Sequence, residues 1–326
     1  MEPKKVMYQI SVIISNFNGS KFLSKLLDTL LAQVNVELQI IIVDRNSTDD
    51  SLSIIKQYSN VKVVFLPPEL GLVAGYHCGY KEAIYDILFF CNEDMWFDDK
   101  CMYECARMID LDNRIAASDP WQWTYDGKYL AHAGVRFKRR FTAYNLSQPI
   151  PFIEEDTEVI LKHGEFVPIM SAGAGMIHRK AYEDCGGWDD SFFLDAEEQD
   201  LFIRFWKLGW KVVTIPTGKV YHALSVSNDQ VVKSIPVKEK RYISNFSNKS
   251  IIALKYLPYY IVALNLISRL LIIFVNLMKG RFNNVVYQFR SLHLTYKRYS
   301  AALMVRRKYM RKEYPDVLNY YKQFMA

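Results

Sequence analysis

The first third of the chain alternates short apolar runs with segments whose apolar residues recur at helical spacing. The runs QISVIISN, LQIIIVD, VKVVFL and YDILFFC predict strands at 9–16, 38–44, 61–66 and 85–91. The segments between them, such as KFLSKLLDTLLAQ at 21–33, predict helices. Strands that are apolar along their whole length are typical of a sheet covered on both faces. The pattern therefore predicts an α/β fold with a mostly parallel sheet and flanking helices.

Polar side chains gather where three of these strands end. The first strand ends in SNFNG, the second in VDRNSTDDS and the fourth in CNED. Because ligands of parallel α/β sheets bind beyond the carboxyl ends of the strands, we expect Asp44, Glu93 and Asp94 to share a cleft. Buried carboxylates are costly without a positive partner, so this concentration of acids predicts a divalent cation that carries phosphate. For Glu93 and Asp94 alone, an ordinary strand end at solvent is the alternative.

Two common nucleotide-binding motifs are missing from the sequence. A dinucleotide-binding domain needs GxGxxG after its first strand, where SNFNGSKF has a single glycine, and no GxxxxGK[ST] segment occurs. The section at about 113–168 is less regular. We expect the tryptophans of WQWTYDGK to be packed rather than to face an acceptor, and the basic cluster RFKRR at 136–140 to be a solvated face.

A further helix is predicted from Glu197, because apolar residues such as Leu201 and Phe205 recur there at helical spacing. Glu197, Glu198 and Asp200 then occupy its first turn, where the helix dipole favours anions. When these acids are considered alone, ordinary charging of a helix N-terminus is the better explanation.

Charge is distributed unevenly along the 326 residues. The net charge is +6, yet 241–326 holds 15 Lys and Arg against two acids and carries +13, whereas 1–240 carries −7. This asymmetry predicts an acidic, enzyme-like body at 1–240 and a basic region at 241–326 that binds an anionic partner. Five cysteines without a CxxC pair predict reduced thiols and a cytoplasmic protein. The N-terminal MEPKKVMYQISVII lacks a small-residue cleavage site, so we expect no signal peptide.

The basic region contains a long apolar segment at 256–278 with Arg269 near its middle. The polar residues of this segment and its end fall on one helical side; they are Asn265, Ser268, Arg269, Asn276 and Lys279. A polar stripe favours an amphipathic helix that lies in a membrane interface over one that spans the bilayer. One spanning helix, or packing on the enzyme body, are the alternatives.

A second amphipathic pattern follows that segment. Its apolar side is predicted to comprise Val285, Phe289, Leu292, Tyr296, Tyr299 and Leu303. The basic residues around and beyond it are Arg290, Lys297, Arg298, Arg306, Arg307, Lys308, Arg311 and Lys312. We therefore predict peripheral attachment to the anionic inner face of the cell membrane. No recognition module for nucleic acid is present, so nucleic acid is not an expected partner.

Six segments, taken in order, carry a family resemblance. SVIISNFNGSKFLSKLLDTL and VDRNSTDDS are similar to a first strand and helix followed by VDNxSxDGS. ELGLVAGYHCGYKEA resembles a glycine-rich NxGxAxxxNxG segment, and CNED stands at a DxD-type metal motif. GGWDDSFFLDAEEQDLFIRFWKLGW resembles GGFDExFFxxxEDxDLxxRxxxxGW, and VYHALSVS follows. Together they resemble the inverting glycosyltransferases of family two, in particular their rhamnosyltransferase-like branch, over about 9–228.

The resemblance implies a GT-A Rossmann-like fold and a role for particular residues. It implies a nucleotide-sugar half at about 1–112 and an acceptor half at about 113–240. Asp94 is the implied ligand of Mg²⁺ or Mn²⁺, with His222 as a second ligand. The implied nucleotide-sugar contacts are Asn16, Asn18, Asp44, Ser47, Gly71, Gly75, Asn92 and Glu93. Glu198 stands where the family has its general-base aspartate, and Glu197 or Asp200 are substitutes because Glu is one methylene longer.

The implied activity is metal-dependent, inverting transfer of a hexosyl or deoxyhexosyl group. The donor is a UDP- or dTDP-linked sugar, and the acceptor is a hydroxyl of a glycan or lipid-linked glycan. A nucleotidyltransferase-type enzyme is one alternative, although SNFNGSKF lacks the glycine-rich, basic phosphate loop of such enzymes. The other alternative is a non-catalytic sugar-nucleotide or membrane-binding relative. Its support is that Glu198 and Asn92 both differ from the family pattern.

Overall fold

The computed structural model describes residues 7–137, 143–145, 150–151, 165–166, 170, 173–223 and 235–309. Its strands are β1 (Tyr8–Asn16), β2 (Val36–Asp44), β3 (Val61–Phe65), β4 (Ile87–Asn92), β5 (Met95–Phe97), β6 (Ile115–Thr124), β7 (Tyr129–His132), β8 (Val135–Phe137), β9 (Ala143–Asn145), β10 (Ile150–Pro151), β11 (Glu165–Phe166), β12 (Ala174–His178) and β13 (Lys211–His222). Its α-helices are α1 (Ser20–Leu31), α2 (Ser51–Ile55), α3 (Gly71–Glu82), α4 (Cys101–Asp110), α6 (Arg179–Cys185), α7 (Glu197–Lys207), α9 (Ile235–Tyr256), α10 (Tyr259–Met278), α11 (Phe282–Lys297) and α12 (Tyr299–Tyr309). A 3-10 turn at Pro68–Leu70 precedes α3.

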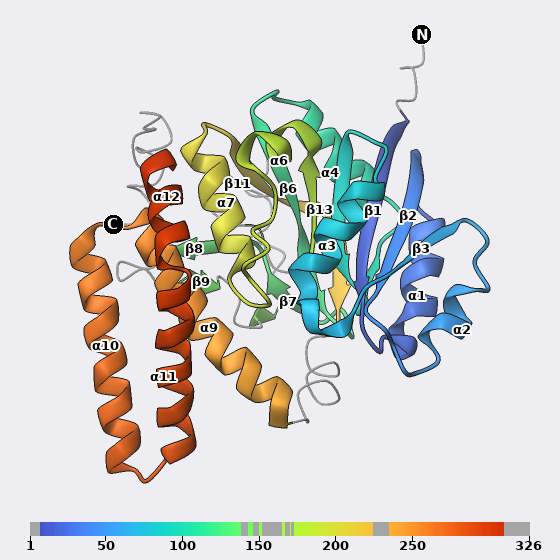
Figure 1. The fold of residues 1–326 in the computed structure, drawn as a ribbon. Coiled ribbons are helices and arrows are strands. Elements are labelled where there is room, and N and C mark those ends of the chain that lie inside the picture. Colours follow the sequence, from blue (N-terminus) through green and yellow to red (C-terminus); the bar gives the residue numbers. More distant parts are fainter. Residues whose placement is uncertain are drawn as a thin grey trace.

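A mixed sheet with helices on both faces forms the centre of the described structure (Figure 1). Strands β3, β2, β1 and β4 lie side by side and run parallel, as predicted. Beyond β4 the sheet departs from the prediction, because β12 pairs antiparallel with both β4 and β6. Strand β13 pairs parallel with β6 but antiparallel with β5. The α/β class with flanking helices is confirmed, whereas the second half of the sheet is mixed rather than parallel.

Alternating side chains build a hydrophobic core on each face of the sheet. Ile13 and Ile41 belong to one core, and their neighbours Ile14 and Ile40 belong to the other. Helices α1, α2 and α4 cover the face with Ile14, and α3, α6, α7 and α9 cover the face with Ile13. This arrangement follows from the period of two in a strand, which turns consecutive apolar residues to opposite faces.

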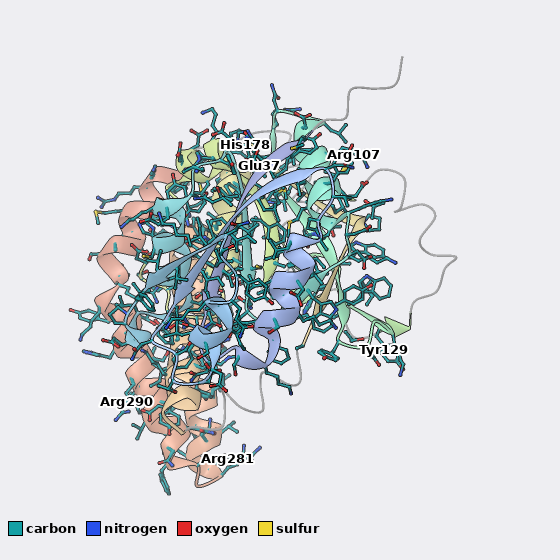
Figure 2. The ribbon with its side chains drawn as sticks, turned by 90° about the vertical axis from the view of Figure 1, so that its right-hand side faces the viewer. Glu37, Arg107, Tyr129, His178, Arg281 and Arg290 are labelled. Atoms are coloured by element: carbon teal, nitrogen blue, oxygen red, sulfur yellow. The ribbon has the colours of Figure 1, made fainter. Side chains whose placement is uncertain are left out.

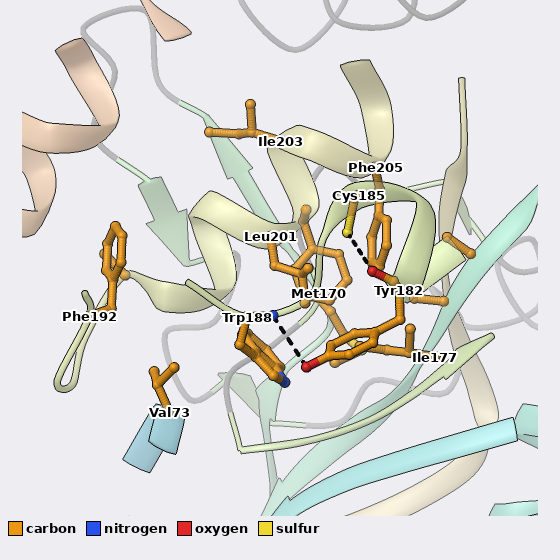
Figure 3. Packing of buried hydrophobic residues seen from close by; sticks show 14 of the residues in the cluster. Val73, Met170, Ile177, Tyr182, Cys185, Trp188, Phe192, Leu201, Ile203 and Phe205 are labelled. Carbon is orange, nitrogen blue, oxygen red and sulfur yellow. Dashed lines mark hydrogen bonds between the residues drawn. The ribbon is translucent and has the colours of Figure 1, made fainter. Parts of the chain in front are cut away.

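The core beneath α7 also fixes the segment that leads from α6 to α7 (Figure 3). Trp188 is buried and its backbone N–H donates to the hydroxyl of Tyr182 at 3.3 Å. Leu201 and Phe205, both fully buried, present the apolar side of α7 to the same cluster. The helical spacing seen in the sequence is therefore the packing face that holds α7 in place.

The tryptophans of WQWTYDGK are packed, as predicted. Trp121 and Trp123 lie on β6 and are 4% and 6% exposed. The basic cluster RFKRR is described only at the backbone of Arg136 and Phe137 in β8, and its remaining residues lie outside the described ranges.

Helix α9 packs against α7, and helices α10 to α12 pack on α9 at this side of the molecule (Figure 1). The predicted boundary at residue 240 falls inside α9. Ile251, Tyr256 and Tyr309 join the same buried cluster as α7. The first and last described helices of the basic region, α9 and α12, therefore share a hydrophobic core with the sheet.

Candidate functional site

The carboxyl ends of β1, β2 and β4 meet at one edge of the sheet, as the sequence predicted. The strand register places Asn16 opposite Asp44 and places Ser15 opposite Asn92. Neighbouring strands lie about 4.8 Å apart, so Asp44 and the CNED segment border the same short stretch of this edge. A Cβ atom added to Gly19, just after β1, would lie 2.6 Å from Glu93 Cγ, which shows how closely the two loops approach.

Asp44 is fully buried at this edge, and hydrogen bonds hold its carboxylate. Asn16 Nδ2 donates to Asp44 Oδ2 at 2.6 Å, while the N–H and Oγ–H of Ser47 donate to Oδ1 and Oδ2, each at 2.8 Å. Asn18 donates its N–H to Ser47 Oγ and accepts from the N–H of Thr48. These bonds offset the cost of burying a carboxylate. Four residues predicted to contact the nucleotide sugar thus form one network, in which Asn16 Oδ1 is buried without a hydrogen-bond partner among the described residues.

Gly71 and Gly75 let α3 approach its neighbours closely. A Cβ at Gly75 would lie 2.5 Å from Ser15 Oγ on β1. Gly71 has φ +80°, and a Cβ there would lie 2.6 Å from the carbonyl oxygen of Phe193, to which Leu72 N–H donates at 3.2 Å. Only glycine fits a left-handed backbone at such short range. The two predicted glycines therefore place α3 between the edge of the sheet and the segment that precedes α7.

Tyr76, on α3, connects the CNED segment with the start of α7. Its hydroxyl donates to Asn92 Oδ1 at 2.8 Å. Burial is the main reason that the pKa of Tyr76 is raised, and the charges of Glu197 and Glu93 add to it, so both carboxylates lie near this hydroxyl. The sequence analysis missed Tyr76, and its place directly after Gly75 was the only available signal.

Glu93 is enclosed beside two charged groups. Burial raises the pKa of Glu93 to about 7, the Asp94 charge acts in the same direction, and the Arg45 guanidinium opposes both. Burial also lowers the pKa of Arg45, and its Nε is buried without a hydrogen-bond partner in the described part of the chain. Arg45 is a second residue that the sequence analysis missed, although it directly follows Asp44 in VDRNSTDDS.

Asp94 and His222 lie together at the same edge. Strand β13 pairs with β5 so that His222 stands opposite Met95, and His222 Nε2 lies 3.3 Å from Asp94 Oδ1. Both side chains are buried, and His222 Nδ1 has no hydrogen-bond partner among the described residues. Two adjacent octahedral ligands of a small divalent cation, each about 2.1 Å from it, lie about 3.0 Å apart. The pair therefore fits two ligands of one cation.

The described residues add no larger group of potential metal ligands to this pair. Among the described residues, no three His, Cys, Asp or Glu side chains are arranged so that they could hold a metal ion. Mg²⁺ commonly binds through one or two carboxylates and takes its other ligands from water and from the phosphates of a substrate.

Glu197 and Glu198 begin α7 directly after two residues with left-handed backbone, Asp195 (φ 67°) and Ala196 (φ 66°). Burial raises the pKa of Glu198 to about 7, with the Asp195 charge adding to the effect and Lys249 opposing it. Burial raises the pKa of Glu197 further above its usual range, and its Oε2 has no hydrogen-bond partner in the described structure. A partly exposed carboxyl with a pKa near 7 suits a general base at neutral pH.

Asp200 has a different environment from the one that its predicted role as a substitute base requires. It is fully buried, and its Oδ2 lies 2.8 Å from Arg204 Nη2. Its Oδ1 accepts from Lys255 Nζ at 2.7 Å and from the hydroxyl of Tyr256 at 2.9 Å. Because protein groups occupy both oxygens, the structure assigns Asp200 to anchoring α7 on α9 rather than to proton transfer.

Helix α9 also holds the turn that precedes Glu197. Asn248 Nδ2 donates to the carbonyl oxygens of Asp195 at 2.7 Å and of Leu194 at 3.0 Å. Arg241 Nε lies 3.1 Å from Asp195 Oδ2. The sequence analysis missed these contacts because it assigned Arg241 and Asn248 to a separate basic region, and no local pattern links them to the turn.

Comparisons with known proteins agree with one another. The model of a family described as glycosyl transferase family 2 matches residues 11–186. The uncharacterized glycosyltransferase YwdF of Bacillus subtilis (strain 168) is 24% identical over 244 residues, which cover 74% of this chain and 84% of YwdF. The O-antigen chain rhamnosyltransferase WbaN of Salmonella anatum is 23% identical over 224 residues, which cover 67% of each protein.

Solved structures share the fold. GalNAc-T7 with UDP, GalNAc and Mn²⁺ has a TM-score of 0.59 at 16% identity, over 78% of this chain and 49% of that structure. TarS 1-349 of S. aureus in complex with UDP-GlcNAc has a TM-score of 0.50 at 16% identity, over 75% of this chain and 66% of TarS 1-349. The chain thus spans about half of the length of GalNAc-T7, and these likenesses bear on the GT-A type of sheet and flanking helices alone.

Proposed function

Because the chain belongs to glycosyl transferase family 2, we propose that it transfers a sugar from a nucleotide-diphosphate sugar to a hydroxyl of a glycan or lipid-linked glycan. The observation that carries this proposal is the convergence of three segments at one edge of the sheet. The Asp44 network and the CNED segment lie at this edge, and Tyr76, which donates to Asn92, links them to the first turn of α7 through the effect of the Glu197 charge on its pKa. Each segment offers groups suited to one part of the reaction.

The Asp44 network is the proposed site of the nucleoside. Asn16 Oδ1 is an acceptor in need of a donor, and a pyrimidine N–H or a ribose hydroxyl supplies one. Asn18 and Ser47 fix the loop that carries this acceptor. Gly75 lets α3 lie close to β1 beside this acceptor, and Gly71 lets the start of α3 lie close to Phe193. The UDP in the GalNAc-T7 structure supports the choice of UDP sugars as the first donors to test, with dTDP sugars next.

Asp94 and His222 are the proposed ligands of Mg²⁺ or Mn²⁺ beside the donor's diphosphate. When bound, this cation neutralises the charge that develops on the leaving diphosphate. Asn92, whose Oδ1 accepts from the hydroxyl of Tyr76, is the proposed hydrogen-bond partner of the sugar or ribose, and Arg45 adds positive charge next to Glu93. Fixed groups of this kind need no reorganisation during the reaction.

Glu198 is the proposed general base of an inverting displacement. Its carboxylate accepts the proton of the acceptor hydroxyl while the hydroxyl oxygen forms a bond to the anomeric carbon and the bond from that carbon to the diphosphate oxygen breaks. Glu197 is the proposed acceptor of a hydrogen bond from a hydroxyl of the transferred or accepting sugar, because its buried Oε2 has no hydrogen-bond partner among the described residues. Asp200 takes no part in this step, since its oxygens are held by α7 and α9.

A donor screen tests the proposal. The purified protein is incubated with UDP-, dTDP- and GDP-sugars and Mn²⁺, and release of the nucleoside diphosphate is measured together with nucleotide binding by calorimetry. We expect binding and slow hydrolysis of at least one donor, both reduced by a chelator. If no donor binds and none is hydrolysed, the proposed function is wrong.

A further inference from the structure

Helices α10 and α11 bury polar side chains and expose apolar ones. Their buried residues are Arg269, Ile273 and Asn276 on α10, and Val285, Gln288 and Ser291 on α11. The large apolar side chains of α10 that are at least 45% exposed are Tyr259, Tyr260, Leu264, Leu266, Ile267, Leu270, Leu271, Phe274, Val275, Leu277 and Met278. Helix α11 adds Phe282, Val286, Phe289 and Tyr296. Surface helices in water have the opposite arrangement, with an apolar stripe that faces the core.

Arg269 shows how the buried polar side chains of the hairpin formed by α10 and α11 find hydrogen-bond partners. Its Nη1 donates to Ser250 Oγ on α9 at 3.0 Å, and its Nε donates to Gln288 Oε1 on α11 at 3.3 Å. Ser250 Oγ also donates to Asn265 Oδ1 at 2.8 Å. The polar stripe predicted on α10 therefore faces α9 and α11 at Asn265, Arg269 and Asn276. The central arginine meets protein partners, and the apolar surface of α10 is left outside.

The predicted apolar side of α11 and α12 is divided rather than continuous. Val285 is buried, whereas Phe289 and Tyr296 are exposed. The buried side of α11 contains Gln288 and Ser291 instead. Arg311 and Lys312 of the predicted basic surface lie outside the described residues. The exposed apolar surface is consequently concentrated on α10 and on one side of α11.

Charge and hydropathy indicate which environment contacts the exposed apolar surface of α10 and α11. The best window of α10 has a mean hydropathy of 2.2, and only 17% of it is buried. No Asp or Glu occurs between Arg241 and Tyr309, whereas Lys279 and Arg281 follow directly on α10. Figure 2 shows Arg281 at the tip of the hairpin, far from Glu37 and His178. A bilayer with anionic headgroups supplies both an apolar interior and negative charge.

The orientation follows from the charged groups on the other side of the hairpin. Arg290 of α11 forms an exposed ion pair with Glu239 of α9, so that side stays in water. Helix α10 is the outer helix in Figure 1, and it exposes apolar residues along its whole length from Tyr259 to Met278. An apolar outer side along the full length of the helix, with the polar side packed on protein, is typical of an amphipathic helix that lies in the membrane plane.

We propose that α10 lies in the plane of an anionic bilayer with its outer apolar side inserted and with Lys279 and Arg281 on lipid phosphates. The catalytic part stays in the cytoplasm on the inner face of the membrane, a compartment that suits the five free cysteines. Helix α9 lies between α10 and the turn that carries Glu197 and Glu198. This docking is independent of the proposed function, because it concerns a surface remote from the nucleotide edge.

A site-directed fluorescence experiment tests the docking and its orientation. Cysteine replaces Leu264, Leu271 or Met278, which are spaced seven residues apart on one exposed side of α10, and an environment-sensitive dye is attached. The matched control is Ile84→Cys, a position that is 69% exposed beside the sheet. Labelled wild-type protein corrects for dye on Cys78. With phosphatidylcholine–phosphatidylglycerol vesicles we expect equal blue shifts and increased emission at all three α10 positions and no change at Ile84.

Each other result overturns a stated part of the proposal. Depth-dependent quenching by spin-labelled lipids is measured at the same three positions, and unequal depths along the helix, with steps of up to about 10 Å, would mean that α10 crosses the bilayer. An equal response at Ile84 would mean non-specific adsorption. No response, together with a dimer in size-exclusion chromatography that Phe274→Ser abolishes, would mean that a second copy covers this surface.

Variants that need no label give a second readout. In vesicle sedimentation, Phe274→Ser should lower the bound fraction, whereas Phe65→Ser, at a residue of similar exposure on β3, should not. Arg281→Ser should weaken binding to anionic vesicles about fivefold and leave binding to pure phosphatidylcholine vesicles unchanged. Equal losses on both vesicles would contradict the headgroup contact. Circular dichroism confirms that each variant is folded.

Discussion

Three carboxylates in one helical turn have three different environments. Asp200 is held by Arg204 and by two side chains of α9, whereas Glu197 is enclosed near Tyr76 with one oxygen unpartnered. Glu198 is partly exposed and has a pKa raised to about 7 by burial. Of the three, only Glu198 combines access from solvent with a proton affinity matched to neutral pH. The turn thus explains why a glutamate could serve here although the family resemblance leads one to expect an aspartate.

Replacement of the proposed base gives the most direct prediction at this scale. Glu198→Gln keeps size and hydrogen bonding but accepts no proton, so turnover should fall about 10²- to 10⁴-fold. Donor affinity, measured by calorimetry, should change little, because Glu198 is not among the groups proposed to bind the nucleotide. The control is Glu82→Gln at the end of α3, a glutamate that is partly exposed like Glu198 and should retain full activity. Unchanged turnover in the Glu198 variant would remove it from the mechanism.

The pKa of Glu198 predicts a pH dependence with a definite sign. A general base must be ionised, so kcat/KM should rise with pH and level off above about 7, the pKa to which burial raises this carboxyl. In Glu198→Gln, the residual kcat/KM should no longer fall as the pH is lowered below about 7; this fall is the acidic limb of the profile. An acidic limb near the ordinary glutamate value of about 4.3 would show that another group controls the rate.

At the scale of elements, α9 acts as a brace for the start of α7. Two consecutive residues with left-handed backbone, Asp195 and Ala196, precede the glutamates, and such conformations persist only when the surroundings enforce them. Asn248 provides that restraint, since its amide donates to two carbonyls of this turn and its Oδ1 accepts from Arg298 Nη1 at 2.7 Å. A helix from the basic region therefore positions the proposed base.

A comparison of two buried asparagines tests this brace. Asn248→Ala should lower kcat at least about tenfold while leaving the KM for the donor nearly unchanged, because a small misplacement of a catalytic group is costly. Asn276→Ala removes a similarly buried amide that bonds within α10 and to α11, so it should lower stability without this kcat effect. Equal kcat losses in the two variants would indicate general destabilisation rather than positioning.

The elements also show what the sequence could and could not predict. The strands and their polar ends were predictable, because a fully apolar run and the residues that follow it are local features. For that reason Asn16, Asp44 and Asn92 meet at one edge as expected. The antiparallel pairing of β12 with β4 and the contact of Arg269 with α9 were not predictable, because both depend on contacts between segments that are distant in the sequence. Tyr76 and Asn248 were missed for the same reason.

On the scale of the whole molecule, the acidic body and the basic helical region form one connected structure. Lys255 of α9 is 3% exposed and reaches Asp189, before α7, at 2.5 Å and Asp200, in α7, at 2.7 Å. Tyr309 of α12 donates its hydroxyl to the carbonyl oxygen of Cys185 at 3.0 Å. The opposite net charges seen in the sequence therefore include buried pairs between the two parts. A membrane-docked helix α10 would be connected to the proposed active site through α9.

Lys255 gives a prediction for this connection. Lys255→Met removes the buried cation shared by two aspartates and should lower the free energy of unfolding by about 3–5 kcal/mol, measured by urea denaturation. Lys249→Met, on an exposed part of α9, should change it by less than about 0.5 kcal/mol. Because Lys255 is close to both carboxylates, its loss should loosen the body and the helical region together, within one transition. Two separate transitions in the wild type would contradict a single cooperative unit.

The same ion pair predicts how stability depends on acid. Burial alone would raise the pKa of Asp189, yet Lys255 lowers it to about 2, below the usual value of about 3.9. A carboxyl with a lowered pKa in the folded state contributes stability above its unfolded value, and this contribution is lost as the pH falls through the folded value. The wild type should therefore lose about 2 kcal/mol from this group between about pH 4 and pH 2. In Lys255→Met the loss over this window should be smaller, because Asp189 then lacks the cation that keeps it ionised. An equal loss in both proteins would show that other carboxylates control the acid response and that Lys255 does not couple the two parts in this way.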